Sequence, residues 1–188
     1  MADRNDVNQR GATAGEKIVG RDDNSVNVLM PGDSQVSVLV KQLDREIHAD
    51  EIREQWIHSL QFFEEQYVPD GVRGLEAKLA RCGRADKVGL ALRHKELFVK
   101  FLSRYSLYGA AQELLALCLH RIHAEFETHV HPACGSSDGA EIDRIVSEKV
   151  VQAVVTEYGL GTFALNHGLV LGMTYWLADR CYVRWHAA

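Results

Sequence analysis

The sequence predicts a mainly α-helical fold: a compact multi-helix bundle with an N-terminal β arm of two short strands and an extended C-terminal tail. Three observations support this prediction. From Val36 onward, apolar residues recur at the spacing of one helix face. Residues 16–30 instead show two short apolar runs on either side of a polar turn. Proline and glycine divide the remaining chain into segments of ordinary helix length. At 188 residues, the chain fits one domain with its own core.

The N-terminal region is expected to differ from the rest of the chain. Residues 1–14 are polar and lack periodicity, which predicts disorder. Residues 15–32 form the predicted β arm, in which Ile18 and Val19 make up one apolar run. A two-stranded ribbon alone is only marginally stable in water. We therefore expect the arm to pack on its own body, on another copy or on another subunit, and residues 33–188 to form the helical domain.

The helical part begins after a turn that ends at Ser34, a favourable N-cap for a helix starting near Val36. A second apolar stripe runs from Ile52 to Tyr67. It is either a second helix capped by Asp50 or a continuation of the first helix as one long rod. Further helices are expected around residues 75–81, from about 86 to 108, from 111 to 131, from 140 to 158 and from 166 to 178.

Two of these expectations are used below. The helix that starts near Asp86 carries an apolar stripe composed of Val88, Leu92, Phe98, Phe101, Leu102 and Tyr105. Pro132 ends the following helix, because proline cannot continue the helical hydrogen bonding, and the loop 131–139 is the best interior linker.

Charge and cysteine usage narrow the function classes. The net charge of −5, with acids and bases interspersed, disfavours direct contact with nucleic acid. Four cysteines without CxxC spacing, and an N-terminus that lacks a secretory signal, predict reduced thiols in a cytoplasmic protein. No nucleotide-binding or catalytic motif is complete, so no cofactor is expected.

One segment raises a membrane alternative. Residues 159–178 carry no formal charge, and a spanning helix needs about 20 apolar residues. The segment also contains four glycines together with Asn166 and His167, which favours a buried core helix over a transmembrane one. A membrane-associated effector remains an alternative, although no membrane partner is expected.

The densest ionisable cluster suggests an enzyme alternative. His120, His123 and Glu127 can share one helix face, and these side chains are credible ligands of a divalent metal. A metal site in a helix bundle usually draws matching ligands from a second helix, and no such motif is present. We therefore expect no metal, with a metal-dependent hydrolase built on these three residues as the alternative function. Cys181 and His186 could form a nucleophilic Cys–His pair, but the sequence shows no motif for the orienting group and the oxyanion site that such a pair needs.

Aromatic and guanidinium groups gather at the C-terminal end, at Trp176, Tyr182, Arg184 and Trp185. Such residues are enriched in interface hot spots, because they combine large apolar area with a hydrogen-bonding end. Trp176 and Trp185 could equally fill the core, and the sequence leaves both possibilities open.

Two stretches resemble a known family. The tail reads Gly172-Met-Thr-Tyr-Trp-Leu-Ala-Asp-Arg-Cys-Tyr-Val-Arg-Trp-His186 and resembles the signature Gly-Met-Ile-Tyr-Tyr-Leu-Thr-x-x-Cys-His-Ile-x-Trp. The stretch Gly15-Glu-Lys-Ile-Val-Gly-Arg-Asp22 resembles Gly-Gly-Asp-Ile-Val-Gly-Arg-Asp-Lys, which often precedes that domain. Both stretches belong to the C-terminal domain of bacterial ABC-three-component systems.

The resemblance implies a function as well as a fold. In these predicted conflict systems, the domain couples an effector to a middle component and an ABC-type ATPase related to SMC and Rad50. It implies a non-enzymatic adaptor in antiviral defence, here a nearly stand-alone module, that works in a homo-oligomer or hetero-complex. The expected partner-binding residues are Ile18, Val19, Arg21, Asp22, Trp176, Tyr182, Arg184 and Trp185. In the family a His commonly follows the signature Cys, whereas this chain has Tyr182, which weakens a metal or catalytic role for Cys181.

Overall fold

The computed structural model describes residues 34–65, 68, 71–159 and 161–186. Within these ranges every regular element is a helix, which confirms the mainly α-helical prediction. The predicted disordered residues 1–14 and β arm 15–32, which includes Ile18, Val19, Arg21 and Asp22, lie outside the described residues.

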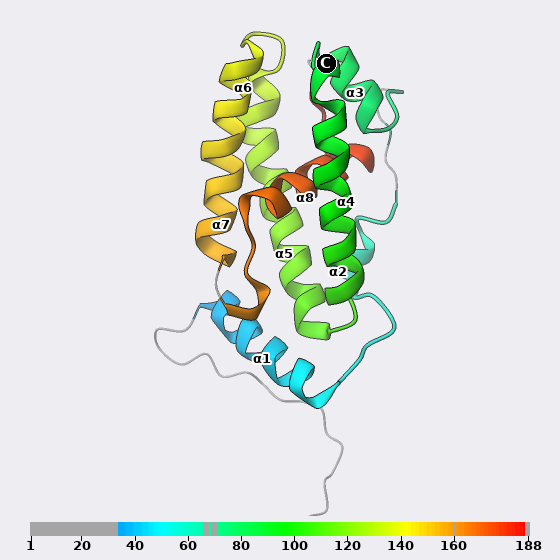
Figure 1. Ribbon diagram of the computed structural model, residues 1–188, viewed down its shortest axis with the longest axis vertical. Coiled ribbons are helices and arrows are strands. Elements are labelled where there is room, and N and C mark those ends of the chain that lie inside the picture. Colours follow the sequence, from blue (N-terminus) through cyan, green and yellow to red (C-terminus); the bar gives the residue numbers. More distant parts are fainter. Residues whose placement is uncertain (1–33, 66–67, 69–70, 160, 187–188) are drawn as a thin grey trace, which may run out of the picture.

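Three long helical rods run side by side along the long axis of the molecule (Figure 1). Two of them contain a π-helical turn, at Phe126–Val130 and at Val146–Val151. The three rods are α4 (Val88–Tyr105), α5 (Gly109–Glu125, extended to Ala133) and the continuous pair α6 (Gly139–Ile145) and α7 (Gln152–Tyr158). The helices predicted for these segments are confirmed.

The last helix, α8 (His167–Asp179), lies across the rods and packs most extensively against α4 (Figure 1). Asn166 caps it, since its side-chain oxygen accepts a hydrogen bond from the Leu169 amide at 3.0 Å. At Gly172 the two backbones approach so closely that an added Cβ would lie 2.2 Å from the His94 carbonyl oxygen. Only glycine therefore fits at this crossing.

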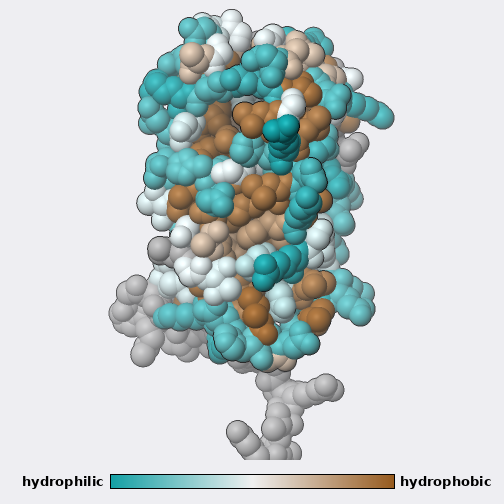
Figure 2. Space-filling model, viewed as in Figure 1, coloured by the Kyte–Doolittle hydropathy of each residue, from teal (hydrophilic) through white to brown (hydrophobic). Residues whose placement is uncertain are grey.

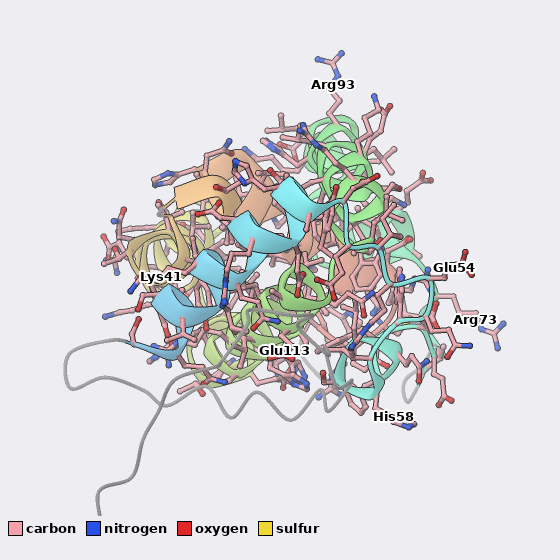
Figure 3. The ribbon with its side chains drawn as sticks, turned by 90° about the horizontal axis from the view of Figure 1, so that it is seen from below. Lys41, Glu54, His58, Arg73, Arg93 and Glu113 are labelled. Atoms are coloured by element: carbon pink, nitrogen blue, oxygen red, sulfur yellow. The ribbon has the colours of Figure 1, made fainter. Side chains whose placement is uncertain are left out.

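The first helix, α1 (Gln35–Ala49), crosses one end of the bundle (Figures 1 and 3). Ser34 is its N-cap, as predicted, and accepts a hydrogen bond from the Ser37 amide at 3.1 Å. At the other end Asp50 adopts a left-handed conformation with φ of 52° and ends the helix. Asp50 therefore caps the end of α1, and both alternatives are wrong: the two segments are not one long rod, and the next helix is capped by Ile57 and not by Asp50.

The stripe from Ile52 to Tyr67 forms only the short helix α2 (His58–Gln61) in its described part. Gln112 on α5, which is fully buried, accepts a hydrogen bond from the Ile57 amide at 2.8 Å and donates one to the Gln55 carbonyl at 3.3 Å. These long-range bonds hold the chain before α2 in a non-helical path.

α5 begins without a capping side chain of its own, and α1 supplies one instead. The carboxylate of Glu46, which is 9% exposed, accepts a hydrogen bond from the Ala110 amide at 2.9 Å. A carboxylate at a helix N-terminus satisfies a free N–H group and complements the helix dipole. This contact fixes α1 to the start of α5.

The remaining short helices complete the bundle. The helix α3 (Leu75–Arg81) lies where the sequence predicted it and packs against α8 and α4. Charged side chains such as Arg93 and Arg73 point outward, away from the core (Figure 3). Among the described residues, no helix combines the length and the apolar character that crossing a membrane requires.

Candidate functional site

The C-terminal segment 180–186 begins with a turn that ends α8. The amide of Tyr182 donates to the Leu177 carbonyl at 2.9 Å, and the amide of Cys181 donates to the Ala178 carbonyl at 3.1 Å. This is the Schellman pattern, which requires a left-handed residue, and Cys181 fills that position with φ of 70°. Cys181 thus takes a place where helices usually have glycine, and its thiol is free and buried.

Lys78 on α3 ties this segment to the bundle. Its side chain is fully buried, and Nζ donates hydrogen bonds to the carbonyls of Ala178 at 2.8 Å and of Val183 at 3.1 Å. A cation at the end of a helix satisfies carbonyls that have no partner within the helix and complements its dipole. Sequence reasoning missed Lys78, because a lone lysine on a short helix gives no sign of burial.

The structure places Trp176 and Trp185 in the core rather than on the surface. Trp185 is 1% exposed, and its ring packs against Phe126 and Tyr175, with centroid distances of 5.0 and 5.7 Å. Trp176 is 4% exposed and meets the Phe98 ring edge-on at 5.6 Å. Of the two possibilities that the sequence left open, core packing is correct for both. A direct partner contact by either indole would require the C-terminal segment to move.

Tyr182 and Arg184, the other two tail residues expected to bind partners, are half-buried. The Tyr182 hydroxyl lies within hydrogen-bonding distance of the carbonyls of Phe62 and Glu65. Its ring lies 5.3 Å from that of Phe62, which is 53% exposed. Tyr182 therefore holds the chain after α2 against the tail. A histidine at this position has no hydroxyl group and could not make the same hydrogen bonds.

The three residues of the metal alternative do not form a metal-binding group. His120 stacks on Phe62 at 5.6 Å, whereas Glu127 pairs with His131 at 3.4 Å. His123 meets the Tyr182 ring edge-on at 6.3 Å. In the described ranges, no three His, Cys, Asp or Glu side chains are arranged to hold a metal ion.

The thiols and His120 have pKa values that reflect burial. Burial raises the pKa of Cys134 to about 11, and the nearby Cys82 thiol adds to this effect. Burial also raises the pKa of Cys118 well above its ordinary value. Burial, followed by the charge of His123, lowers the pKa of His120. Neither Cys118 nor Cys134 is therefore present as a nucleophilic thiolate at neutral pH.

An apolar groove lies on the face where α8 crosses between α4 and the π turn Val146–Val151. Its volume is about 220 Å³, and it is lined mainly by Leu90, Val146, Val151, Leu171 and Tyr175, with Arg84, Lys87 and Asp143 among its polar lining residues. Figure 2 shows apolar side chains gathered over the centre of this face, with polar atoms around them.

Two exposed leucines of α4 extend the groove. Leu90 is 53% exposed and Leu97 is 44% exposed, and their spacing of seven residues places them on one face of the helix. Leu97 also lies next to α8, because its Cδ2 atom is 3.5 Å from where a Cβ on Gly168 would lie. Sequence reasoning missed both residues. The sequence did contain a sign of their exposure, because neither leucine belongs to the predicted core stripe of this helix.

The comparison with known families concerns this same region. The family model of C-terminal domain 9 of the ABC-three component (ABC-3C) systems, CTD9, matches residues 74–185, which is more than half of the chain. The chain belongs to the CTD9 family. No curated protein and no solved structure matches the chain.

The extent of the match agrees with the packing. The CTD9 region starts at α3, contains all three long rods and ends at Trp185. It therefore includes the Lys78 contacts, the α4–α8 crossing and the whole apolar groove. The resemblance of the C-terminal signature to the ABC-three-component domain is thus confirmed.

Proposed function

We propose that this CTD9 domain is a non-enzymatic adaptor of a bacterial ABC-three component conflict system, acting in antiviral defence. In this proposal the apolar groove binds another component of the system, the ABC-type ATPase or the middle component, in a hetero-complex. Family membership supports a place in a system of several components. The observation on which the groove assignment rests is the pair of exposed leucines, Leu90 and Leu97, beside an apolar depression.

The size of the groove favours a protein partner over a small substrate. Small-molecule pockets typically enclose about 300–1,000 Å³, whereas the groove encloses about 220 Å³. Apolar side chains from a partner helix or loop fit such a depression. Covering Leu90 or Leu97 would contribute up to about 1.5–3 kcal/mol for each side chain. The partly exposed Lys87 and Asp143, which also line the groove, would orient the partner.

The distribution of ionisable groups supports the non-enzymatic part of the proposal. His120 and His123 contact aromatic rings, and Glu127 pairs with His131, so their side chains serve packing and helix-surface contacts. The four free cysteines support a cytoplasmic location, where thiols stay reduced.

Co-purification of the chain with the other components of its system tests the proposal. A charge in an apolar interface remains desolvated and without a partner. The variants Leu90→Glu and Leu97→Glu are therefore expected to lower the amount of co-purified partner at least about tenfold, the effect of losing about 1.4 kcal/mol of binding.

Val99→Glu is the matched control. Val99 lies on α4, is 40% exposed, and faces away from Leu97 because two residues turn a helix by about 200°. This variant is expected to retain its partner. Equal retention of the partner by Leu97→Glu and Val99→Glu, with both variants folded, would reject the groove as the docking surface.

A further inference from the structure

A second pocket lies where the end of α3, the loop before α6 and the C-terminal segment meet. It shares only Arg84 with the residues that line the apolar groove. Its volume is about 370 Å³, within the range of small-molecule pockets. We call it the Arg84 pocket. Its lining includes Arg81, Arg84, Ser137, Ile142, Trp185 and His186.

Arg84 is buried with much of its hydrogen-bonding capacity unused. Only 4% of the residue is exposed, and one nitrogen, Nη2, is paired with Asp143. The face of its guanidinium lies over the Trp185 ring, with Cζ 5.0 Å from the ring centroid. Its Nε and Nη1 atoms are buried and have no hydrogen-bond acceptor within the described part of the chain.

The Trp185 indole adds another buried donor to the same wall. Its Nε1 atom likewise has no acceptor among the described residues. Buried donors without acceptors are rare, because each one costs about 1–3 kcal/mol relative to a hydrogen-bonded donor. Three such nitrogens, contributed by two adjoining side chains in one pocket wall, indicate that an acceptor-rich ligand is accommodated there.

The charges around the pocket specify the kind of acceptor. Two arginines line it, the buried Arg84 and the exposed Arg81, and none of the described residues that line it carries a carboxylate side chain. The two acids next to lining residues in the sequence already have partners: Asp143 pairs with Arg84 and Lys87, and Asp138 accepts a hydrogen bond from the Glu141 amide at 2.8 Å. Guanidinium groups bind carboxylate and phosphate oxygens most strongly.

We propose that the Arg84 pocket binds a small molecule that carries a phosphate or carboxylate group. The anion meets Arg81 first at the rim. Because solvent does not reach Nε and Nη1 of Arg84, the anion gains these donors only when the side chains that cover them shift. The proposal does not depend on the docking function, since it rests on Arg81, Arg84 and Trp185 rather than on the exposed leucines.

The indole N–H resonance of Trp185 in ¹⁵N-labelled protein reports directly on this pocket. Inorganic phosphate and citrate would be titrated separately at constant ionic strength, with Trp185→Phe used to assign the resonance. We expect a saturable shift of the Trp185 signal with at least one anion, while the indole signals of Trp56 and Trp176 stay in place. A shift of the Trp185 signal with phosphate alone would identify a phosphate-bearing ligand. A shift with citrate alone would identify a carboxylate-bearing ligand.

Variants of three arginines complete the test. Arg81→Ala leaves the core intact and should raise the dissociation constant about tenfold, the effect of losing one charge-assisted hydrogen bond. Arg84→Met should abolish binding. Arg93→Ala, which removes an outward-pointing arginine of α4 (Figure 3), should leave binding unchanged. The absence of a saturable shift with either anion, or equal weakening by Arg81→Ala and Arg93→Ala, would overturn the proposal.

Discussion

At the scale of single residues, the C-terminal signature has a structural role that its composition conceals. Trp185 is enclosed by Arg84, Phe126 and Tyr175, and it anchors the tail in the core. Lys78 binds the carbonyls at the end of α8, so the signature depends on a residue about one hundred positions earlier in the chain. Residues that resemble an interface hot spot therefore stabilise the domain.

The substitution Lys78→Met tests this role. Methionine has a similar length but cannot donate, so the Ala178 and Val183 carbonyls lose a charged donor while buried. We expect the free energy of unfolding to fall by about 2–3 kcal/mol in chemical denaturation. Lys100→Met, which breaks an exposed pair with Glu96, should change it by less than about 0.5 kcal/mol. Similar small effects of both substitutions would show that Lys78 does not secure the tail.

His120 gives the domain a predictable acid sensitivity. Burial and the neighbouring His123 lower its pKa from the ordinary value of 6.5. Between the lowered folded pKa and about 6.5, the unfolded chain binds the proton more readily, so stability falls as the pH drops through this window. His120→Gln should narrow the difference in melting temperature between pH 7.5 and pH 5.5. Between pH 8.5 and pH 7.5 the substitution should have no such effect. If the difference in melting temperature between pH 7.5 and pH 5.5 is the same in His120→Gln as in the unsubstituted protein, His120 is not the source of the acid sensitivity.

At the scale of the helices, the close α4–α8 crossing organises the fold. The absence of a side chain at Gly172 lets α8 lie against the α4 backbone at His94 and Phe98. This contact places the remaining α8 side chains over α5 and the π turn Val146–Val151. The apolar groove on this face exists because α8 covers only part of the apolar surface of α4.

Gly172→Ala is expected to destabilise the domain by about 1–3 kcal/mol, the usual cost of overpacking, because its Cβ would lie 2.2 Å from a backbone oxygen. Gly89→Ala is the matched control. Gly89 lies in α4, and a Cβ there meets nothing within 4 Å. It should be neutral or raise stability by about 0.4–1 kcal/mol through the unfolded state. Thermal or chemical unfolding of both variants measures the difference, and a stabilised Gly172→Ala protein would contradict the described crossing.

The sequence predicted those helices whose signals are local. Helical periodicity and Ser34 as an N-cap act within a few residues, and both agree with the structure. Pro132 was predicted to end its helix, but it lies inside the short 3-10 turn His131–Ala133, with which the rod ends one residue later. The segment after Asp50 was predicted to be helical and is mostly not. Its path depends on hydrogen bonds of Ile57 and Gln55 with Gln112, more than fifty residues away, which no local pattern reveals.

The candidate sites were harder to predict than the helices. A buried cation such as Lys78 or Arg84 looks like any surface cation in the sequence, because its burial depends on distant carbonyls and rings. The tail composition left interface and core equally open for Trp176 and Trp185, and only the packing against Phe98 and Phe126 shows that both lie in the core.

At the scale of the whole molecule, the two candidate surfaces adjoin one another. Arg84 lines both the apolar groove and the Arg84 pocket, so one side chain lies in the wall between them. The face shown in Figure 2 has apolar side chains at its centre, and in Figure 3 the side chains of Arg73 and Arg93 project away from the body of the molecule. The domain thus carries an apolar groove, the proposed docking face, next to a pocket lined by two arginines.

Site-specific photo-crosslinking tests the central claim, partner docking in the groove, most directly. A photoreactive phenylalanine analogue would replace Leu97 in one protein and Val99 in another, and each would be irradiated in the presence of the other system components. Because the two positions lie on opposite faces of α4, only the probe at 97 should form a covalent adduct with a partner subunit. Adducts formed only from position 99, or equally from both positions, would contradict docking in the groove.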